Sequence, residues 1–170
     1  MLGPTQIREG RRGRYGARVT SPVLLCTDGS DISQAALAAG LELLGRDVPL
    51  ALVTVIDDPD PMLVSGTGFA GGVMTPEALD DMTAAAKQGA QEILDATATA
   101  LDLVGTPSYV LRGDAATAIC ELASEVDARA IVLGSRGRGG FRRAVMGSVS
   151  DHVVRNAPCP VVVTGQHDGG

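Results

Sequence analysis

One short segment, residues 134–148, gathers glycine and arginine in a chain whose net charge is −6. Its sequence, GSRGRGGFRRAVMGS, holds five glycines and four arginines and lies between the apolar run AIVL and the run VSDHVV. Glycine allows a backbone to approach a ligand closely, and arginine donates charge-assisted hydrogen bonds to anions. A flexible connector with solvated arginines is the alternative, but strand-to-helix connections usually have about 2–6 residues. The length and composition therefore favour an anion-binding loop.

The end of this segment carries the signals of a helix start. Ser148 precedes an apolar run and Asp151 follows three residues later, the spacing of a capping box, which predicts that a helix begins at Gly147 and Ser148. A helix N-terminus presents unpaired N–H groups and a partial positive charge, both of which favour phosphate. The Ser148 hydroxyl could cap its own helix or turn toward the phosphate. Four arginines could add donors: Arg136, Arg138, Arg142 and Arg143.

Alternating strands and helices must position this loop. Short apolar runs predict strands at residues 22–27, 50–56, 109–111, 130–133 and 161–164, and helical patterns fill residues 33–44, 75–101, 116–126 and 148–156. This alternation predicts an α/β fold, a single doubly wound five-stranded parallel sheet with strand order 3-2-1-4-5 and helices on both faces. Ligands bind such sheets beyond the carboxyl ends of the strands, where the strand order reverses. The turn Asp28-Gly29-Ser30 and the glycine–arginine loop should therefore face one crevice.

Capping residues mark the predicted helix boundaries. Ser30 or Asp31 is expected to cap the first helix, and Gly45 to end it. Thr75 followed by Pro76 predicts the start of the long helix, and Asp114 the start of the next.

Length and charge bound the organisation and the partners. The chain has 170 residues, enough for one domain, which we expect at residues 19–165 between a basic, disordered arm at 1–18 and a tail at 166–170. The net charge is −6 although the arm holds five arginines against Glu9, so the body is strongly acidic, which argues against a nucleic-acid binder. The arm could contact polyanions, but a solvated tail is favoured.

The chain lacks the signals of export or membrane insertion. No apolar run approaches the ~18 residues of a membrane span or the apolar core of a secretory signal. Cys26, Cys120 and Cys159 are odd in number and lack CxxC spacing, so we expect a cytoplasmic protein with reduced thiols. Cys120 is expected in the core, and Cys26 and Cys159 are candidates for redox-sensitive thiols.

Other phosphate and catalytic motifs are weaker. Lys87 is the only lysine and follows Ala86 where a P-loop requires glycine, which excludes a P-loop. A GxGxxG match at residues 66–71 lies inside a long loop, residues 57–74. We expect this loop to be either a mobile segment that covers the ligand or an ordinary loop. Ser148, Asp151 and His152 do not form a hydrolase site, because neighbouring side chains on a helix point apart and no GxSxG elbow exists. No catalytic residue is therefore expected.

With these residues placed, the chain resembles a universal stress protein of the UspA type over about residues 22–164. The most specific element is the spacing Gly134-x2-Gly137-x9-Gly147-Ser148, which matches the G-2x-G-9x-G-[S/T] pattern of the ATP-binding branch of that family. Supporting elements are Asp28-Gly29-Ser30, TVID at 54–57, GDAATAI at 113–119 and APCPVVV at 157–163.

This resemblance implies a fold like that of the adenine nucleotide alpha hydrolases and an ATP site that could also hold Mg²⁺. Thr27 and Asp28 would meet the adenosine end, Asp28 would lie near the ribose or a bound metal, and Val55 would pack against the adenine. The residues that would surround the phosphates are Gly134, Gly137, Gly147, Ser148 and Val149, and charge adds Arg136 and Arg138. Cys26 stands where relatives often carry a small residue or proline.

Three functions remain open at this stage. The first is a regulatory module of the stress response, in which ATP alters the protein and thereby its contact with an unidentified protein partner. The second is a slow ATPase or phosphotransfer enzyme with Asp28 holding Mg²⁺, and the third is a structural dimer without nucleotide. The glycine spacing argues against the third, and the lack of an evident base favours the first over the second. Cyclic AMP or another adenine nucleotide could replace ATP.

The last strand suggests a homodimer. Val161–Thr164 is apolar and uncharged, and an edge strand of this kind promotes aggregation unless it is paired or covered. In relatives this strand pairs with its copy across a two-fold axis. Coverage by the arm or the tail is the alternative.

Overall fold

The computed structural model describes residues 21–58, 75–135 and 146–165. The basic arm, the motif at 66–71, the tail, and the candidate residues Arg136, Gly137 and Arg138 lie outside the described residues. In chain order the elements are β1 (Val23–Cys26), α1 (Asp31–Leu44), β2 (Leu50–Ile56), α3 (Pro76–Ala100), β3 (Ser108–Arg112), α4 (Ala115–Glu125), β4 (Ala130–Gly134), α5 (Ser148–Asn156) and β5 (Val161–Thr164).

The strands form one parallel sheet in the order β3-β2-β1-β4-β5. This confirms the predicted α/β doubly wound architecture and its strand order. Leu25 pairs with Leu52 of β2 on one side and with Val132 of β4 on the other, so β1 and β4 are neighbours at the point where the chain order reverses.

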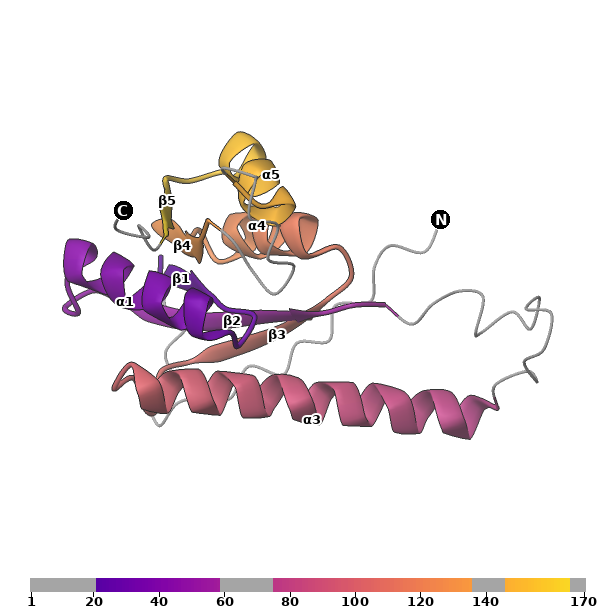
Figure 1. Cartoon of the computed structure of the whole chain (residues 1–170). Helices are drawn as coiled ribbons and strands as arrows, with labels where there is room; N and C mark the ends of the chain where they lie inside the picture. The colour runs from indigo at the N-terminus through magenta and orange to yellow at the C-terminus, as the bar shows by residue number, and fades with distance from the viewer. Residues whose placement is uncertain (1–20, 59–74, 136–145, 166–170) are drawn as a thin grey trace.

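Helices cover both faces of the sheet, as Figure 1 shows for α3 on one side and for α4 and α5 on the other. On the first face, Leu37 and Leu41 of α1 and Leu94 of α3 pack in one buried cluster with alternate strand residues. On the second face, Ile119 of α4 and Val153 of α5 pack with the remaining strand residues. Burial on both faces explains why the central strands read as unbroken apolar runs.

Side-chain caps fix the starts of three helices. The N–H of Ser33 donates to the Ser30 hydroxyl at 3.2 Å, that of Ala78 to the Thr75 hydroxyl at 3.3 Å, and that of Thr117 to the Asp114 carboxylate at 2.9 Å. Gly45, with φ of 78°, ends α1 as its position predicts. These boundaries could be located in advance because caps are local interactions.

The predicted capping box of α5 is wrong in its details. Gly147 occupies the N-cap position, no side chain bonds there, and Ser148 is the first helical residue. The Asp151 carboxylate does not reach back to the cap; it forms a two-point ion pair with Arg155, at 3.0 Å for each contact. An i,i+4 arginine offers two charge-assisted hydrogen bonds, which explains why Asp151 pairs with it.

Burial distinguishes the three thiols. Cys26 is 8% exposed, whereas Cys120 and Cys159 are half-buried against the cluster on the α4 side. Burial raises the pKa of each thiol, most strongly that of Cys26, where the neighbouring Cys120 and Cys159 thiols add to the rise. A raised pKa lowers the thiolate fraction, so these environments do not support the redox sensitivity considered for Cys26 and Cys159.

Across the described ranges, no helix has the length and apolar character needed to cross a membrane.

Candidate functional site

The candidate residues that the structure describes gather at one edge of the sheet, beyond the carboxyl ends of β1, β2 and β4. Cys26, the last residue of β1, pairs with Val53, so Thr27 and Asp28 leave β1 at the edge of the sheet toward which β2 continues through Val55. Leu25 pairs with Val132, so Gly134, the last residue of β4, lies toward the same edge. The sheet topology thus joins residues that are more than 100 positions apart in the sequence.

The turn after β1 is held by its own side chains. The Asp28 carboxylate accepts two hydrogen bonds at Oδ1, from the Ser30 N–H at 3.0 Å and from the Ser30 hydroxyl at 2.6 Å. The Ser30 hydroxyl also accepts the Ser33 N–H that caps α1. The start of α1 therefore fixes Asp28 at the edge of the sheet, where its side chain is half-buried.

Thr27 and Val55 reach the same edge but face opposite sides of the sheet. The Thr27 hydroxyl lies 3.0 Å from that of Ser33 and accepts the Gly29 N–H at 3.0 Å, so it is turned toward α1 and is 6% exposed. Val55 packs against the cluster on the α4 side. The Thr27 hydroxyl thus shapes the turn, and Val55 is the apolar side chain on the other face.

The glycine–arginine loop begins and ends at one point. The Gly147 N–H donates to the Ser135 carbonyl at 2.7 Å, which brings together the two described ends of the segment. The Ser135 N–H donates to the Thr164 carbonyl at 2.7 Å, so β5 holds the same residue from the other side. Gly134, the last residue of β4, is thereby fixed next to the start of α5.

The N-terminus of α5 is the one helix start in the described part of the chain without a side-chain cap. A helix leaves its first four N–H groups without intrahelical partners, and here the first of these belong to Ser148 and Val149. Both residues are exposed, Val149 by 37%. The arrangement can therefore present backbone donors and a positive helix end to an anion.

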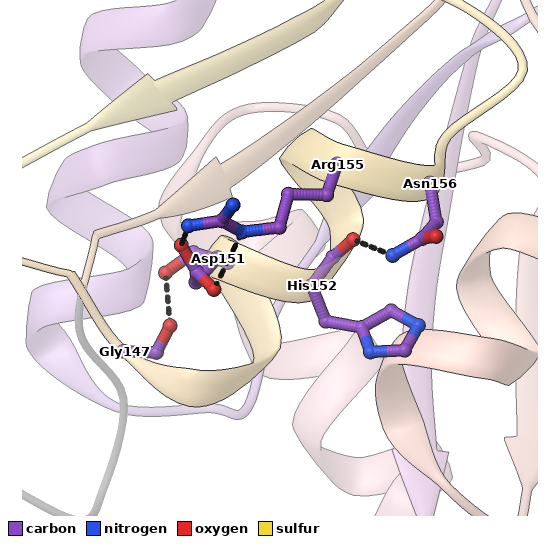
Figure 2. A network of polar contacts seen from close by, with 6 residues as sticks. Gly147, Asp151, His152, Arg155 and Asn156 are labelled. Carbon is purple, nitrogen blue, oxygen red and sulfur yellow. Dashed lines mark hydrogen bonds and ion pairs between the residues drawn. The ribbon is translucent and has the colours of Figure 1, made fainter.

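The polar residues of α5 do not form a catalytic triad. Figure 2 shows Asp151 clasped by Arg155 and the His152 ring turned away from that pair. The hydrogen bonds from Arg155, and then its positive charge, lower the pKa of Asp151, while desolvation of the carboxylate acts in the opposite direction. His152 is exposed.

Metal binding has limited support from side chains alone. Within residues 21–58, 75–135 and 146–165 no three His, Cys, Asp or Glu side chains gather closely enough to hold a metal ion. A Mg²⁺ site at Asp28 would need oxygen ligands from a bound nucleotide, which is how protein-bound Mg²⁺ is commonly completed.

Two serines at the loop ends were missed by the sequence analysis. Ser135 supplies the carbonyl that closes the loop, and Ser150 is 2% exposed with its hydroxyl 2.9 Å from the Gly147 carbonyl and 3.3 Å from that of Ser135. A serine three residues after the N-cap glycine was the available signal for Ser150. Nothing local in the sequence marks Ser135.

Comparison with known proteins gives a family match and consistent folds. The family model described as "Universal stress protein family" matches residues 20–165. A universal stress protein of Methanocaldococcus jannaschii is 28% identical over 153 residues, 88% of this chain and 85% of the relative. A universal stress protein of Thermus aquaticus is 32% identical over 83% of this chain and 96% of the relative. The chain spans 46% of the length of a longer universal stress protein of Mycobacterium tuberculosis, with 32% identity.

Solved structures share the fold. The universal stress protein UspA of Lactobacillus plantarum has a TM-score of 0.58 and 27% identity, covering 87% of this chain and 99% of its own. An Arabidopsis thaliana family member, solved with AMP bound, has a TM-score of 0.56 and 21% identity over 87% of this chain and 93% of its own. A universal stress protein in complex with cAMP has a TM-score of 0.50 and 23% identity, with coverage of 88% and 99%.

Proposed function

The chain belongs to the universal stress protein family, and from this premise we propose that it is a regulatory module of the stress response that binds ATP in the crevice beyond β1 and β4. In this proposal, ATP binding alters how the protein binds a partner protein in the cytoplasm, and the protein is not primarily an enzyme.

The observation that carries the proposal is the uncapped N-terminus of α5 at the reversal of strand order. It lies beside the fixed ends of the glycine–arginine loop, on the sheet edge that also carries the Asp28 turn. This is where open α/β sheets bind ligands and where helix ends bind phosphate. Family members solved with AMP and with cAMP support an adenine nucleotide as the ligand.

We propose the following contacts with the nucleotide. Thr27 and Asp28 lie at the ribose end, and Val55 packs against the adenine. The phosphates contact three glycines, two arginines of the loop and the first turn of α5. These residues are Gly134, Arg136, Gly137, Arg138, Gly147, Ser148 and Val149. Bound Mg²⁺ would be held by Asp28 and by phosphate oxygens, and it would neutralise the phosphate charge.

A regulatory role is favoured over an ATPase by the side chains around α5. Asp151 is held by Arg155 and His152 points away from it, so neither is placed to orient a nucleophile. If rigorously purified protein released phosphate from ATP at a rate abolished by Asp28→Asn, the regulatory proposal would fall in favour of a slow ATPase.

We further propose that the protein is a homodimer through β5. β5 is the edge strand of the sheet next to β4, and its three valines are half-buried in the single chain. A second copy of β5 would pair the exposed edge and cover these valines.

Native mass spectrometry of freshly purified protein tests ligand and subunit number together. We expect a dimer that carries adenine nucleotide, and calorimetric titration of nucleotide-free protein should show binding of ATP. Protein that binds none of ATP, AMP and cAMP would contradict the proposal and leave a structural dimer as the remaining function.

A matched pair of variants tests where the phosphate binds. Ser148→Asp places a negative charge at the first residue of α5, which favours the helix but repels phosphate. Ser148→Asn has a similar size without the charge. We expect Ser148→Asp to weaken ATP binding at least about 10-fold relative to Ser148→Asn, given the strength of charge-assisted contacts. Equal affinities would exclude the α5 N-terminus as the phosphate site.

A further inference from the structure

The Ser150 hydroxyl is a buried polar group at the loop ends that the proposed contacts do not use. Ser150 is 2% exposed, in the first turn of α5. Its hydroxyl lies 2.9 Å from the Gly147 carbonyl oxygen and 3.3 Å from the Ser135 carbonyl oxygen. The single hydroxyl proton is donated chiefly to Gly147, at the shorter distance, with the Ser135 carbonyl close enough to share it.

The Gly147 carbonyl belongs to the same peptide plane as the Ser148 N–H. In a trans peptide these two groups point in opposite directions. The Gly147 carbonyl points into the helix, because it accepts the Asp151 N–H at 2.9 Å as well as the Ser150 hydroxyl. The Ser148 N–H is therefore directed out of the helix end.

The other side of this peptide is restrained as well. The Gly147 N–H donates to Ser135, and the Ser135 N–H is bonded to Thr164 of β5. Among the contacts that the structure describes, the Ser150 hydroxyl is the only side-chain donor that lies within reach of both the Gly147 carbonyl and the Ser135 carbonyl. Glycine at 147 has no side chain to limit its rotation, so these hydrogen bonds set the orientation of the peptide.

We propose that Ser150 is a positioning residue for phosphate binding: its hydroxyl orients the Gly147–Ser148 peptide so that the Ser148 N–H faces the phosphate group of the nucleotide. Ser150 does not touch the ligand. This inference rests on the proposed function, since it assumes that an adenine nucleotide places its phosphates at the start of α5.

Paired titrations with ATP and with adenosine test the inference. Ser150→Ala removes the hydroxyl, while the Asp151 N–H still bonds to the Gly147 carbonyl and keeps the helix turn. We expect ATP to bind about 2- to 10-fold more weakly, the range of one hydrogen bond, and adenosine to bind unchanged because it has no phosphate. The matched control is Ser108→Ala, a buried serine at the amino end of β3, which should change neither affinity.

Each result separates the inference from the function on which it rests. Unchanged ATP affinity in Ser150→Ala would overturn the inference, as would an equal loss for ATP and adenosine, because that pattern indicates a general disturbance of the crevice. Amide NMR gives a second measurement: the Ser148 N–H signal should shift in Ser150→Ala before nucleotide is added. Wild-type protein that binds adenosine and ATP equally, or neither of them, would contradict the proposed function itself.

Discussion

Gly29 lies against the side chain of Ile93, so close that a Cβ at Gly29 would be 2.9 Å from Ile93 Cγ2. Gly29 also has φ of +82°, a conformation that costs other L-residues energy. The turn that carries Asp28 is thus shaped by a contact with α3, which begins at Pro76, 47 residues after Gly29 in the chain.

Gly29→Ala should destabilise the protein by about 2–4 kcal/mol, from overpacking and from the left-handed backbone together. In an Ile93→Ala background the packing part should disappear and leave about 1–2 kcal/mol. Urea unfolding of the two single variants and the double variant measures this difference. Strictly additive effects would show that Gly29 and Ile93 are not in contact.

Gly40→Ala should destabilise the protein although alanine favours helices. A Cβ at Gly40 would overlap the Cγ1 methyl of Val132 in β4, an internal strand of the sheet. Overpacking costs about 1–3 kcal/mol, against about 1 kcal/mol gained in helix propensity. Gly89→Ala is the matched control, since nothing lies within 4 Å of a Cβ there. It should stabilise the protein by up to about 1 kcal/mol. Thermal unfolding measures both variants. If the unfolding temperatures of both lay above that of the wild type, or both below it, the opposite effects expected for the two positions would be contradicted.

Asp114 should make a small part of the stability depend on acid pH. Hydrogen bonds from the Thr117 side chain and backbone, with a smaller effect of the His152 charge, lower its pKa below the usual 3.8. A lowered pKa in the folded state contributes stability that is fully present above the unfolded value of 3.8 and is lost as pH falls through the folded value.

The test compares Asp114→Asn, which keeps the cap without titrating, and Asp114→Ala, which removes it. At neutral pH, Asp114→Ala should cost about 1 kcal/mol and Asp114→Asn much less. On acidification the wild type should lose stability relative to Asp114→Asn. A constant difference between these two proteins across the acid range would mean that Asp114 has no altered pKa.

The proposed dimer can be broken through one side of β5. The Thr164 carbonyl accepts a hydrogen bond from the Ser135 N–H, and the Pro160 carbonyl accepts one from the Ile131 N–H. The backbone groups of the even-numbered residues in and next to β5 therefore face β4. In a parallel ladder the alternate residues point the other way, which directs the N–H of Val163 to the open edge. Val163→Pro removes that donor and should give a folded monomer, because proline is tolerated on edge strands.

Val162→Pro is the contrasting variant, because its N–H faces β4 and the substitution should destabilise the subunit itself. Sedimentation measures the mass, and circular dichroism the fold. A folded Val163→Pro protein that remained dimeric would exclude pairing through β5.

Strand runs and helix caps could be predicted because they depend on near neighbours. Leu50–Ile56, Ser148–Asn156 and Val161–Thr164 were located to the residue, and the caps at Thr75 and Asp114 were recognised from residue type and position. For the first helix the sequence offered Ser30 or Asp31, and the structure shows that Ser30 is the cap and Asp31 the first helical residue. The start of α5 was located correctly, but the predicted capping box was wrong. The Asp151 carboxylate bonds to Arg155, which donates two hydrogen bonds, instead of to the backbone at the helix start. A glycine N-cap such as Gly147 has no side chain to form a capping hydrogen bond, so no residue type in the sequence marks it as the cap.

By itself, then, the sequence determined the alternation of strands and helices along the chain and the glycine spacing that marks the candidate site, both of which are local patterns. The reversal between β1 and β4 was the prediction most consistent with this alternation, and the sheet pairing confirmed it. Only the tertiary structure decided that Thr27 turns its hydroxyl to α1 while Val55 faces the other side, and that Ser135 joins the loop ends to β5. Such contacts link residues far apart in the chain, and their geometry depends on how helices pack on the sheet.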